Sequence, residues 1–254
     1  MISISDLSFG YDEETILENI SVDIKAGQIT SILGANGCGK STLLSIISKN
    51  IENYSGIVSL EGKDIKSIGL KSFAQKVAVV HQKQNAPDDI TVEQLVSYGR
   101  LPYRSILKVG LDEEGKKHVN KALKLTELEN LRYRKIGTLS GGQRQRVYIA
   151  MALAQDAKVL LLDEPTTFLD VRYQVEIMRL IKKLNKQNGI TILMVIHDIN
   201  QAITYSDNII GIAGKKILFE GSPDAVISKE SIYNLYNIDL PVFNQEGQVC
   251  VLTI

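Results

Sequence analysis

The chain has 254 residues, and its 29 Lys and Arg are balanced by 29 Asp and Glu, so its formal net charge is zero. This balance leaves no strong positive field of the kind that holds proteins non-specifically on nucleic acid. A hydrophobic content of 44% allows a buried core and excludes intrinsic disorder. Its apolar runs fall far short of the roughly 20 residues that a membrane-spanning helix needs, and the N-terminus shows no signal-peptide pattern. We therefore expect a cytoplasmic protein that by itself neither spans a membrane nor is exported.

The predicted elements follow an α/β pattern along the chain. Polar alternation in the first 28 residues, together with residues 57–60, predicts a small antiparallel sheet. Helical spacing of apolar residues predicts helices at residues 147–154 and 177–184. Four runs rich in Ile, Val and Leu predict strands buried on both faces: residues 29–33, 159–163, 190–196 and 209–213. Buried strands that alternate with helices indicate a mostly parallel sheet covered by helices.

The middle of the chain, residues 83–155, contains no run of the buried-strand type. Thr91 begins a capping box of the form T-x-x-Q, which predicts the start of a helix in this region. We interpret 83–155 as a helical subdomain inserted into a core formed by residues 1–82 and 156–254. No linker separates these parts, so we expect one domain over residues 1–254.

A phosphate-binding loop follows the first buried strand. Residues 34–41, GANGCGKS, match the pattern G-x-x-x-x-G-K-[ST] between a predicted strand and a helix. Glycines let backbone N–H groups converge on phosphate oxygens, and the helix N-terminus adds partial positive charge. Lys40 is then expected on the β- and γ-phosphates, and the Ser41 hydroxyl on Mg²⁺. Cys38 lies inside the loop with no neighbouring base in the sequence, so we interpret it as a spectator.

Polar residues end two other predicted strands. Asp163 and Glu164 follow the run VLLL, and His197 follows ITILMVI. Because ligands bind at the carboxyl ends of parallel strands, we expect these side chains beside the phosphate loop. Asp163 would then hold Mg²⁺, Glu164 would accept hydrogen bonds from an attacking water, and His197 would contact the γ-phosphate. Acids and single histidines at strand ends are often only structural, and the phosphate loop is what favours the catalytic interpretation.

A second glycine-rich string, LSGGQ at residues 139–143, precedes the helix that is predicted to end near Ala154. Ser140 and Gln143 have the spacing of a capping box, so the string could simply begin a helix. Adjacent glycines at a helix N-terminus also make a second anion site.

With these motifs the chain resembles the nucleotide-binding subunits of ATP-binding cassette (ABC) transporters over nearly its whole length. LSGGQ is similar to their signature motif, residues 34–41 to their Walker A loop, and residues 159–164 to their Walker B strand. Gln82 matches the Q-loop, Asp170 the D-loop and His197 the switch histidine.

The resemblance implies a P-loop NTPase that uses ATP and Mg²⁺ and works as a head-to-tail dimer. The signature segment of one copy would close over the γ-phosphate held by Lys40 of the other. The implied catalytic residues are Glu164, His197, Gln82 and Lys40. The implied metal ligands are Ser41, Gln82 and Asp163. The implied nucleotide contacts are Tyr11, which would stack on adenine, and Gly34, Ala35, Asn36, Gly37, Cys38, Gly39, Lys40, Ser41, Thr42, Ser140, Gly141, Gly142, Gln143 and Asp170.

Longer strings are similar to the ATPases of importers for ferric siderophores, haem and cobalamin. These strings are SYGRLPY from Ser97, DEPTTFLD from Asp163, MVIHDINQA from Met194 and the tail after Gly221. The sequence departs mildly from the wider family: His81 replaces a frequent Pro, and Thr167 replaces a frequent Ser or Asn. Neither departure puts a catalytic role in doubt.

An aromatic and Arg-rich segment follows the Q-loop, a composition that favours protein interfaces. On composition alone it could equally be a solvated loop. The resemblance implies that it receives a permease element, with Gln82 linking hydrolysis to its movement. The expected interface residues are Tyr98, Arg100, Pro102, Tyr103 and Arg104.

The expected partners are a second copy, transmembrane permease subunits and, indirectly, an extracytoplasmic substrate-binding protein, with no nucleic acid. The expected location is the cytoplasmic face of the membrane. Two alternatives stay open: an ATPase of another nutrient importer or an exporter, and a soluble ABC ATPase without a transport role. Repair-type members have long coiled-coil insertions, whereas only 56 residues (139 − 82 − 1) separate Gln82 from Leu139 here.

Overall fold

The computed structural model describes residues 1–12, 14–104, 110–245 and 248–253. The chain divides into two compact units. The first unit comprises Met1–Ile68 and Thr191–Ile254, and the second comprises Gly69–Ile190. None of the helices in the described residues is both long enough and apolar enough to cross a membrane.

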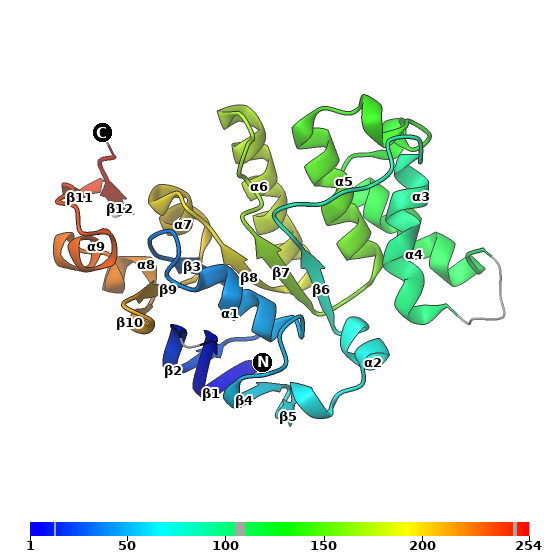
Figure 1. Cartoon of the computed structure of the whole chain (residues 1–254). Coiled ribbons are helices and arrows are strands. Elements are labelled where there is room, and N and C mark those ends of the chain that lie inside the picture. The colour runs from blue at the N-terminus through cyan, green and yellow to red at the C-terminus, as the bar shows by residue number, and fades with distance from the viewer. Residues whose placement is uncertain (13, 105–109, 246–247, 254) are drawn as a thin grey trace. The chain divides into compact units, whose positions relative to one another are not determined.

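The first unit contains an antiparallel sheet and a set of mostly parallel strands (Figure 1). The antiparallel sheet has the order β2-β1-β4-β5, formed by Glu14–Ile24, Ile2–Tyr11, Ser55–Leu60 and Lys63–Asp64. β3 (Ile29–Leu33) pairs in parallel with β8 (Thr191–Val195) and β9 (Asn208–Ala213), while β10 (Lys216–Gly221) pairs antiparallel with β9. The residues of β3 and β8 are all buried, as their continuous apolar runs predict.

Short helices and a hairpin complete the first unit. The hairpin consists of β11 (Val242–Gln245) and β12 (Gln248–Val251). The helices are α1 (Lys40–Ile47), the 3₁₀ turn η1 (Ile65–Ser67), α7 (Ile199–Tyr205), α8 (Pro223–Val226) and α9 (Lys229–Tyr236).

The second unit is mainly helical around two parallel strands, β6 (Val77–Val80) and β7 (Val159–Asp163). Its α-helices are α2 (Leu70–Ala74), α3 (Val92–Ser97), α4 (Glu113–Leu125), α5 (Gly141–Ala154) and α6 (Val171–Asn188). Its 3₁₀ turns are η2 (Tyr98–Tyr103), η3 (Glu129–Leu131) and η4 (Ile136–Thr138). Figure 1 shows α3, α4 and α5 packed together.

The predicted α/β class, with mostly parallel strands and an N-terminal antiparallel sheet, is confirmed. The four predicted buried strands are β3, β7, β8 and β9, and the capping box at Thr91 begins α3. Strand β6 was not predicted, because its run VAVV has only four residues. The subdomain boundary at 83–155 stays a prediction.

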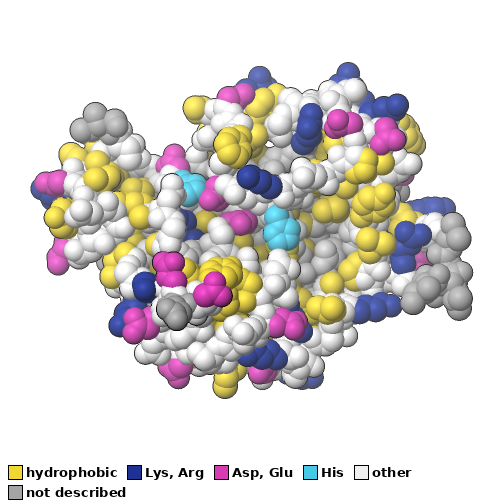
Figure 2. All heavy atoms as spheres, viewed as in Figure 1, with side chains coloured by type: hydrophobic (Ala, Val, Ile, Leu, Met, Phe, Trp, Pro, Cys, Tyr) yellow, Lys and Arg dark blue, Asp and Glu magenta, His cyan; other side chains and the backbone are white. Residues whose placement is uncertain are grey.

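On the face drawn in Figure 2, Lys and Arg side chains are interspersed with Asp and Glu. This mixture agrees with the zero net charge of the sequence.

Candidate nucleotide-binding and catalytic site

The phosphate loop connects β3 to α1 within the first unit. Gly39 is the N-cap of α1 and has φ of +102°, a conformation that side chains with a Cβ rarely adopt. A Cβ at this position would lie 2.7 Å from Cδ2 of Leu17. The positive φ therefore favours glycine here, and any larger residue would also have to displace the Leu17 side chain of β2.

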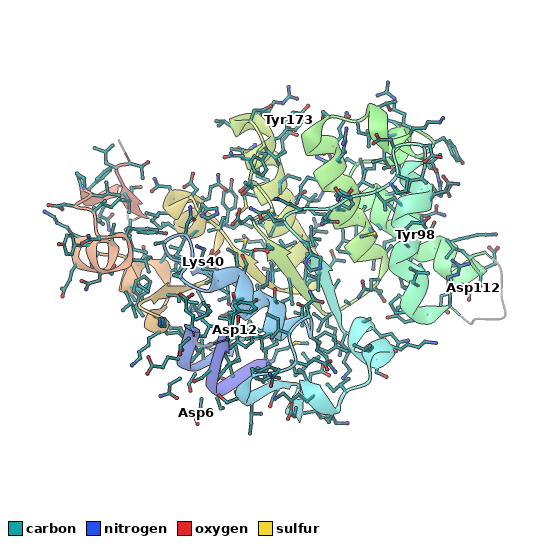
Figure 3. All side chains as sticks on the ribbon, in the orientation of Figure 1. Asp6, Asp12, Lys40, Tyr98, Asp112 and Tyr173 are labelled. Atoms are coloured by element: carbon teal, nitrogen blue, oxygen red, sulfur yellow. The ribbon has the colours of Figure 1, made fainter. Side chains whose placement is uncertain are left out.

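Lys40 is the first residue of α1, and only 5% of its surface is exposed (Figure 3). Its ammonium donates hydrogen bonds to the carbonyl oxygens of Gly34 and Ala35, at 2.8 and 2.9 Å. Both acceptors are neutral backbone carbonyls of the loop, and their hydrogen bonds keep the Lys40 ammonium beside the loop. The geometry therefore places a cation where the pattern predicts phosphate.

The rest of the loop contains both exposed and partly buried positions. Ala35, Asn36, Gly37 and Ser41 are exposed, while Cys38 and Thr42 are partly buried. Burial raises the pKa of the Cys38 thiol, and the charge of Lys40 offsets this only in part. The thiol is therefore protonated at neutral pH, which supports its interpretation as a spectator.

Two other predicted residues of the first unit are exposed at strand ends. Tyr11 ends β1, and its ring meets that of Phe9 edge-on at 4.9 Å between centroids. His197 follows β8 and precedes the N-cap of α7. Tyr236 of α9, which the sequence analysis missed, lies near the loop: burial raises the pKa of its hydroxyl to about 12, and Cys38 adds a smaller upward contribution.

In the second unit, the side chains of Gln82, Glu164 and Thr167 meet just after β7. Asp163 is the last residue of the strand and Glu164 follows it. Gln82 donates a hydrogen bond from its amide to Oε2 of Glu164. Thr167 Oγ1 donates to the same oxygen at 2.9 Å. The structure thus brings two of the predicted residues together, and adds Thr167, to which the sequence analysis gave no role.

The signature string begins α5 with a complete capping box. Ser140 Oγ accepts a hydrogen bond from the Gln143 backbone N–H at 3.3 Å, and Gln143 Oε1 accepts one from the Ser140 N–H at 3.1 Å. The simple structural interpretation of this spacing is therefore correct. It does not exclude anion binding, because a hydroxyl that accepts a hydrogen bond keeps its own proton to donate.

The second signature glycine packs against α6. A Cβ on Gly142 would lie 2.4 Å from the ring of Tyr173, which Figure 3 labels on α6. Asp170, the D-loop residue, is the N-cap of α6, and its carboxylate accepts from the Tyr173 N–H at 3.1 Å. Tyr173 therefore contacts both the signature segment and the D-loop. The first signature glycine, Gly141, is exposed.

An ion-pair network also joins α5 to α6. Arg146 of α5, whose side chain is 19% exposed, lies 2.5 Å from Glu176 and 3.4 Å from Glu127. Glu176 also pairs with Arg172 at 2.9 Å, but the Arg172 side chain is 80% exposed. Because exposed pairs contribute little, we expect Arg146 to be the stabilising member of the network.

Replacing Arg146 with methionine should lower the melting temperature at pH 7 by about 2–4 °C. A hydrogen bond from Arg172, followed by the charge of Arg146, holds the pKa of Glu176 below its ordinary value. Because its folded pKa is lowered, the Glu176 carboxyl stabilises the fold at pH values above its unfolded pKa. This stabilisation disappears as the pH falls through the lowered folded pKa. The difference between wild type and Arg146→Met in thermal unfolding should therefore shrink in acid. Arg172→Met is the matched comparison, and an equal loss there would contradict the assignment to Arg146.

The segment predicted to meet a permease forms η2, which packs on α5. Tyr98 and Tyr103 are exposed. Arg100, however, is only 4% exposed: its guanidinium donates to the carbonyl of Ala154 at 2.9 Å and lies 3.9 Å from the centre of the Tyr103 ring. Arg100 therefore caps the C-terminus of α5 and holds η2 against this helix. The sequence predicted Arg100 at the permease surface, but its side chain is buried.

Beside η2 lies an open groove of about 500 Å³, here called the α3 groove. Its lining residues are Ile90, Glu93, Gln94, Ser97, Tyr98, Arg104, Gly110, Leu111, Lys116, Asn120 and Arg132. Pro102 is partly buried and is not part of this lining. The groove was not predicted from the sequence, because its lining residues come from α3, η2, α4 and the loops around them, spread over residues 90–132.

Known proteins show which class of nucleotide-binding protein these features define. The pattern of the ABC transporter family matches residues 17–167. The achromobactin transport ATP-binding protein of Dickeya dadantii (strain 3937) is 41% identical, over 94% of this chain and 88% of its own. The ferric enterobactin transport ATP-binding protein of Escherichia coli (strain K12) is 39% identical, over 91% and 85%.

Solved structures agree. One is cbiO1 from Clostridium perfringens, part of the ABC transporter complex cbiONQ: it is 33% identical with a TM-score of 0.80, over 91% of this chain and 92% of that one. Another is a dimeric post-hydrolysis ATP-binding cassette bound to ADP and Pi: it is 32% identical with a TM-score of 0.74, over 88% and 99%. The chain therefore belongs to the ABC transporter family, as one of its ATPases.

Proposed function

We propose that this chain is the ATP-hydrolysing subunit of an importer for an iron(III)–siderophore or a related metal chelate. The observation that carries the proposal is the identity of about 40% over nearly the whole chain with proteins named for achromobactin and enterobactin transport. Lys40 at the phosphate loop and Glu164 with its hydrogen-bond donors supply the groups that hydrolysis needs.

In this mechanism the site residues of each unit have separate roles. Lys40 binds the β- and γ-phosphates, and Tyr11 stacks on the adenine. Glu164 accepts the proton of the attacking water, while His197 contacts the γ-phosphate. The side chains of Ser41, Gln82 and Asp163 offer a hydroxyl, an amide and a carboxylate oxygen, and Mg²⁺ prefers oxygen ligands. Bound Mg²⁺ would neutralise the charge that develops on the phosphate.

A second copy completes the site from its signature segment. The Ser140 hydroxyl and the backbone around Gly142 would face the γ-phosphate held by Lys40 of the other copy. The capping geometry supports this role, because Ser140 is exposed and its hydroxyl can still donate. ATP bound between the copies would then join them, and its hydrolysis would release them.

The α3 groove and η2 are the surface that we assign to the permease. Tyr98 lines the groove, and Leu101 exposes an apolar side chain beside it on η2. Such a surface suits a short amphipathic element of a membrane subunit. The chain would thus sit peripherally at the cytoplasmic face, and an extracytoplasmic binding protein would deliver the chelate to the permease.

The test is uptake of radioactive iron(III)–siderophore into proteoliposomes that contain this chain and its permease, with the binding protein and ATP supplied on their respective sides. We expect uptake that requires ATP. ATP hydrolysis without uptake of any chelate would overturn the import proposal and leave the ATPase assignment standing.

Replacing Tyr98 and Leu101 together with aspartate should abolish uptake while leaving the nucleotide affinity of the isolated chain unchanged. Charge on an apolar contact prevents its desolvation against the permease. Leu218→Asp is the matched control, since Leu218 is a similarly exposed leucine on β10. Unchanged uptake in the double variant would remove this surface from the interface.

A further inference from the structure

The catalytic carboxylate proposed here is held by its own downstream turn. Thr167 lies three residues after Glu164, and its N–H donates to the Glu164 carbonyl at 3.3 Å. This turn brings the Thr167 hydroxyl back to Oε2 of Glu164, at 2.9 Å. The amide of Gln82 donates to the same oxygen. Two donors from different segments therefore fix the orientation of one carboxylate.

The backbone of this turn is unusual. Glu164 has φ of +51° and Phe168 has φ of +64°, so left-handed residues flank the turn on both sides. Non-glycine residues adopt this conformation rarely, and it persists only where the surroundings enforce it. Thr166, inside the turn, is buried. The hydroxyl of Thr167 is thus presented to Glu164 by a constrained segment and not by a freely rotating loop.

The same turn forms the first part of the D-loop, the string TTFLD at residues 166–170. Phe168 is 87% exposed and precedes Asp170, the N-cap of α6. A second copy that binds the D-loop would contact residues next to Thr167.

We propose that Thr167 is a positioning residue, whose hydroxyl orients the Glu164 carboxylate for proton abstraction and ties that orientation to the D-loop. The proposal rests on the proposed role of Glu164 as general base. A misoriented base loses rate without losing substrate affinity, because orientation contributes to the transition state and not to ground-state binding.

Steady-state ATP hydrolysis by Thr167→Val tests the role. Valine keeps the shape of threonine but lacks the donor, so we expect kcat to fall by about 10- to 100-fold with KM for ATP within about twofold of wild type. Thr167→Ser restores the hydroxyl and should recover most of the rate. Thr204→Val is the matched control, since the exposed Thr204 hydroxyl donates to the Asn200 carbonyl of its own helix, α7, at 2.8 Å.

A double-mutant cycle separates positioning from a general loss of structure. If Thr167 acts through Glu164, then adding Thr167→Val to Glu164→Gln should cost no further activity. Wild-type kcat in Thr167→Val, or equal losses in both Glu164 backgrounds, would overturn the proposal. Failure of the wild-type chain to hydrolyse ATP would instead overturn the proposed function.

Discussion

Replacing Glu164 with glutamine should reduce ATP hydrolysis by about 10²- to 10⁴-fold and leave ATP binding intact, the range that a general base contributes. Glutamine retains a carbonyl oxygen that accepts hydrogen bonds from Gln82 and Thr167, so the local structure is expected to persist. An amide cannot take up the proton of the attacking water. Steady-state phosphate release and fluorescent-nucleotide titration measure the two quantities separately.

The control for this substitution is Glu18→Gln. Glu18 is an exposed residue of β2 whose carboxylate lies 3.6 Å from Lys216, and its loss should alter neither hydrolysis nor binding. Because Glu164→Gln consumes ATP far more slowly than the wild type, it should also accumulate as a dimer in size-exclusion chromatography with ATP. Full hydrolysis by the variant would exclude Glu164 as the general base. A monomer at saturating ATP would contradict the nucleotide-joined dimer.

Features with a local physical cause could be predicted from the sequence. The phosphate loop needs glycines in fixed positions, and the structure shows why at Gly39, where φ is positive and a Cβ would collide with Leu17. Capping boxes are equally local, and those at Thr91 and Ser140 both form. Buried parallel strands produce continuous apolar runs, although the four residues of β6 are too few to stand out.

Features that depend on distant partners could not be predicted in the same way. Arg100 lies in a segment whose composition favours interfaces, yet its side chain is buried and donates to the carbonyl of Ala154, 54 positions away. Tyr173 occupies the space above Gly142, which no spacing rule relates to it. Thr167 is a local feature that could have been considered, because Thr side chains in turns often form hydrogen bonds with groups a few residues away.

Replacing Lys40 with methionine should weaken ATP binding by about 10- to 100-fold, since a hydrogen bond to a charged group contributes about 1.5–3 kcal/mol. Methionine keeps the unbranched apolar stem, which suits a position that is 5% exposed, and removes only the ammonium. Hydrolysis should then be undetectable, because the same charge would stabilise the γ-phosphate in the transition state.

The substitution also removes the donor that the Gly34 and Ala35 carbonyls share. The control is therefore Lys49→Met: its ammonium donates to a backbone carbonyl in the same way, to Ile68 at 2.6 Å, but just beyond the C-terminal end of α1. If loss of any lysine–carbonyl bond were enough to disturb the unit, both variants would lose affinity together. If the ammonium binds phosphate, only Lys40→Met loses it. Lys40→Arg keeps the charge but replaces a compact ammonium with a broad planar group. Because position 40 is buried, this group should not fit, and we expect ATP affinity to stay low in Lys40→Arg as well.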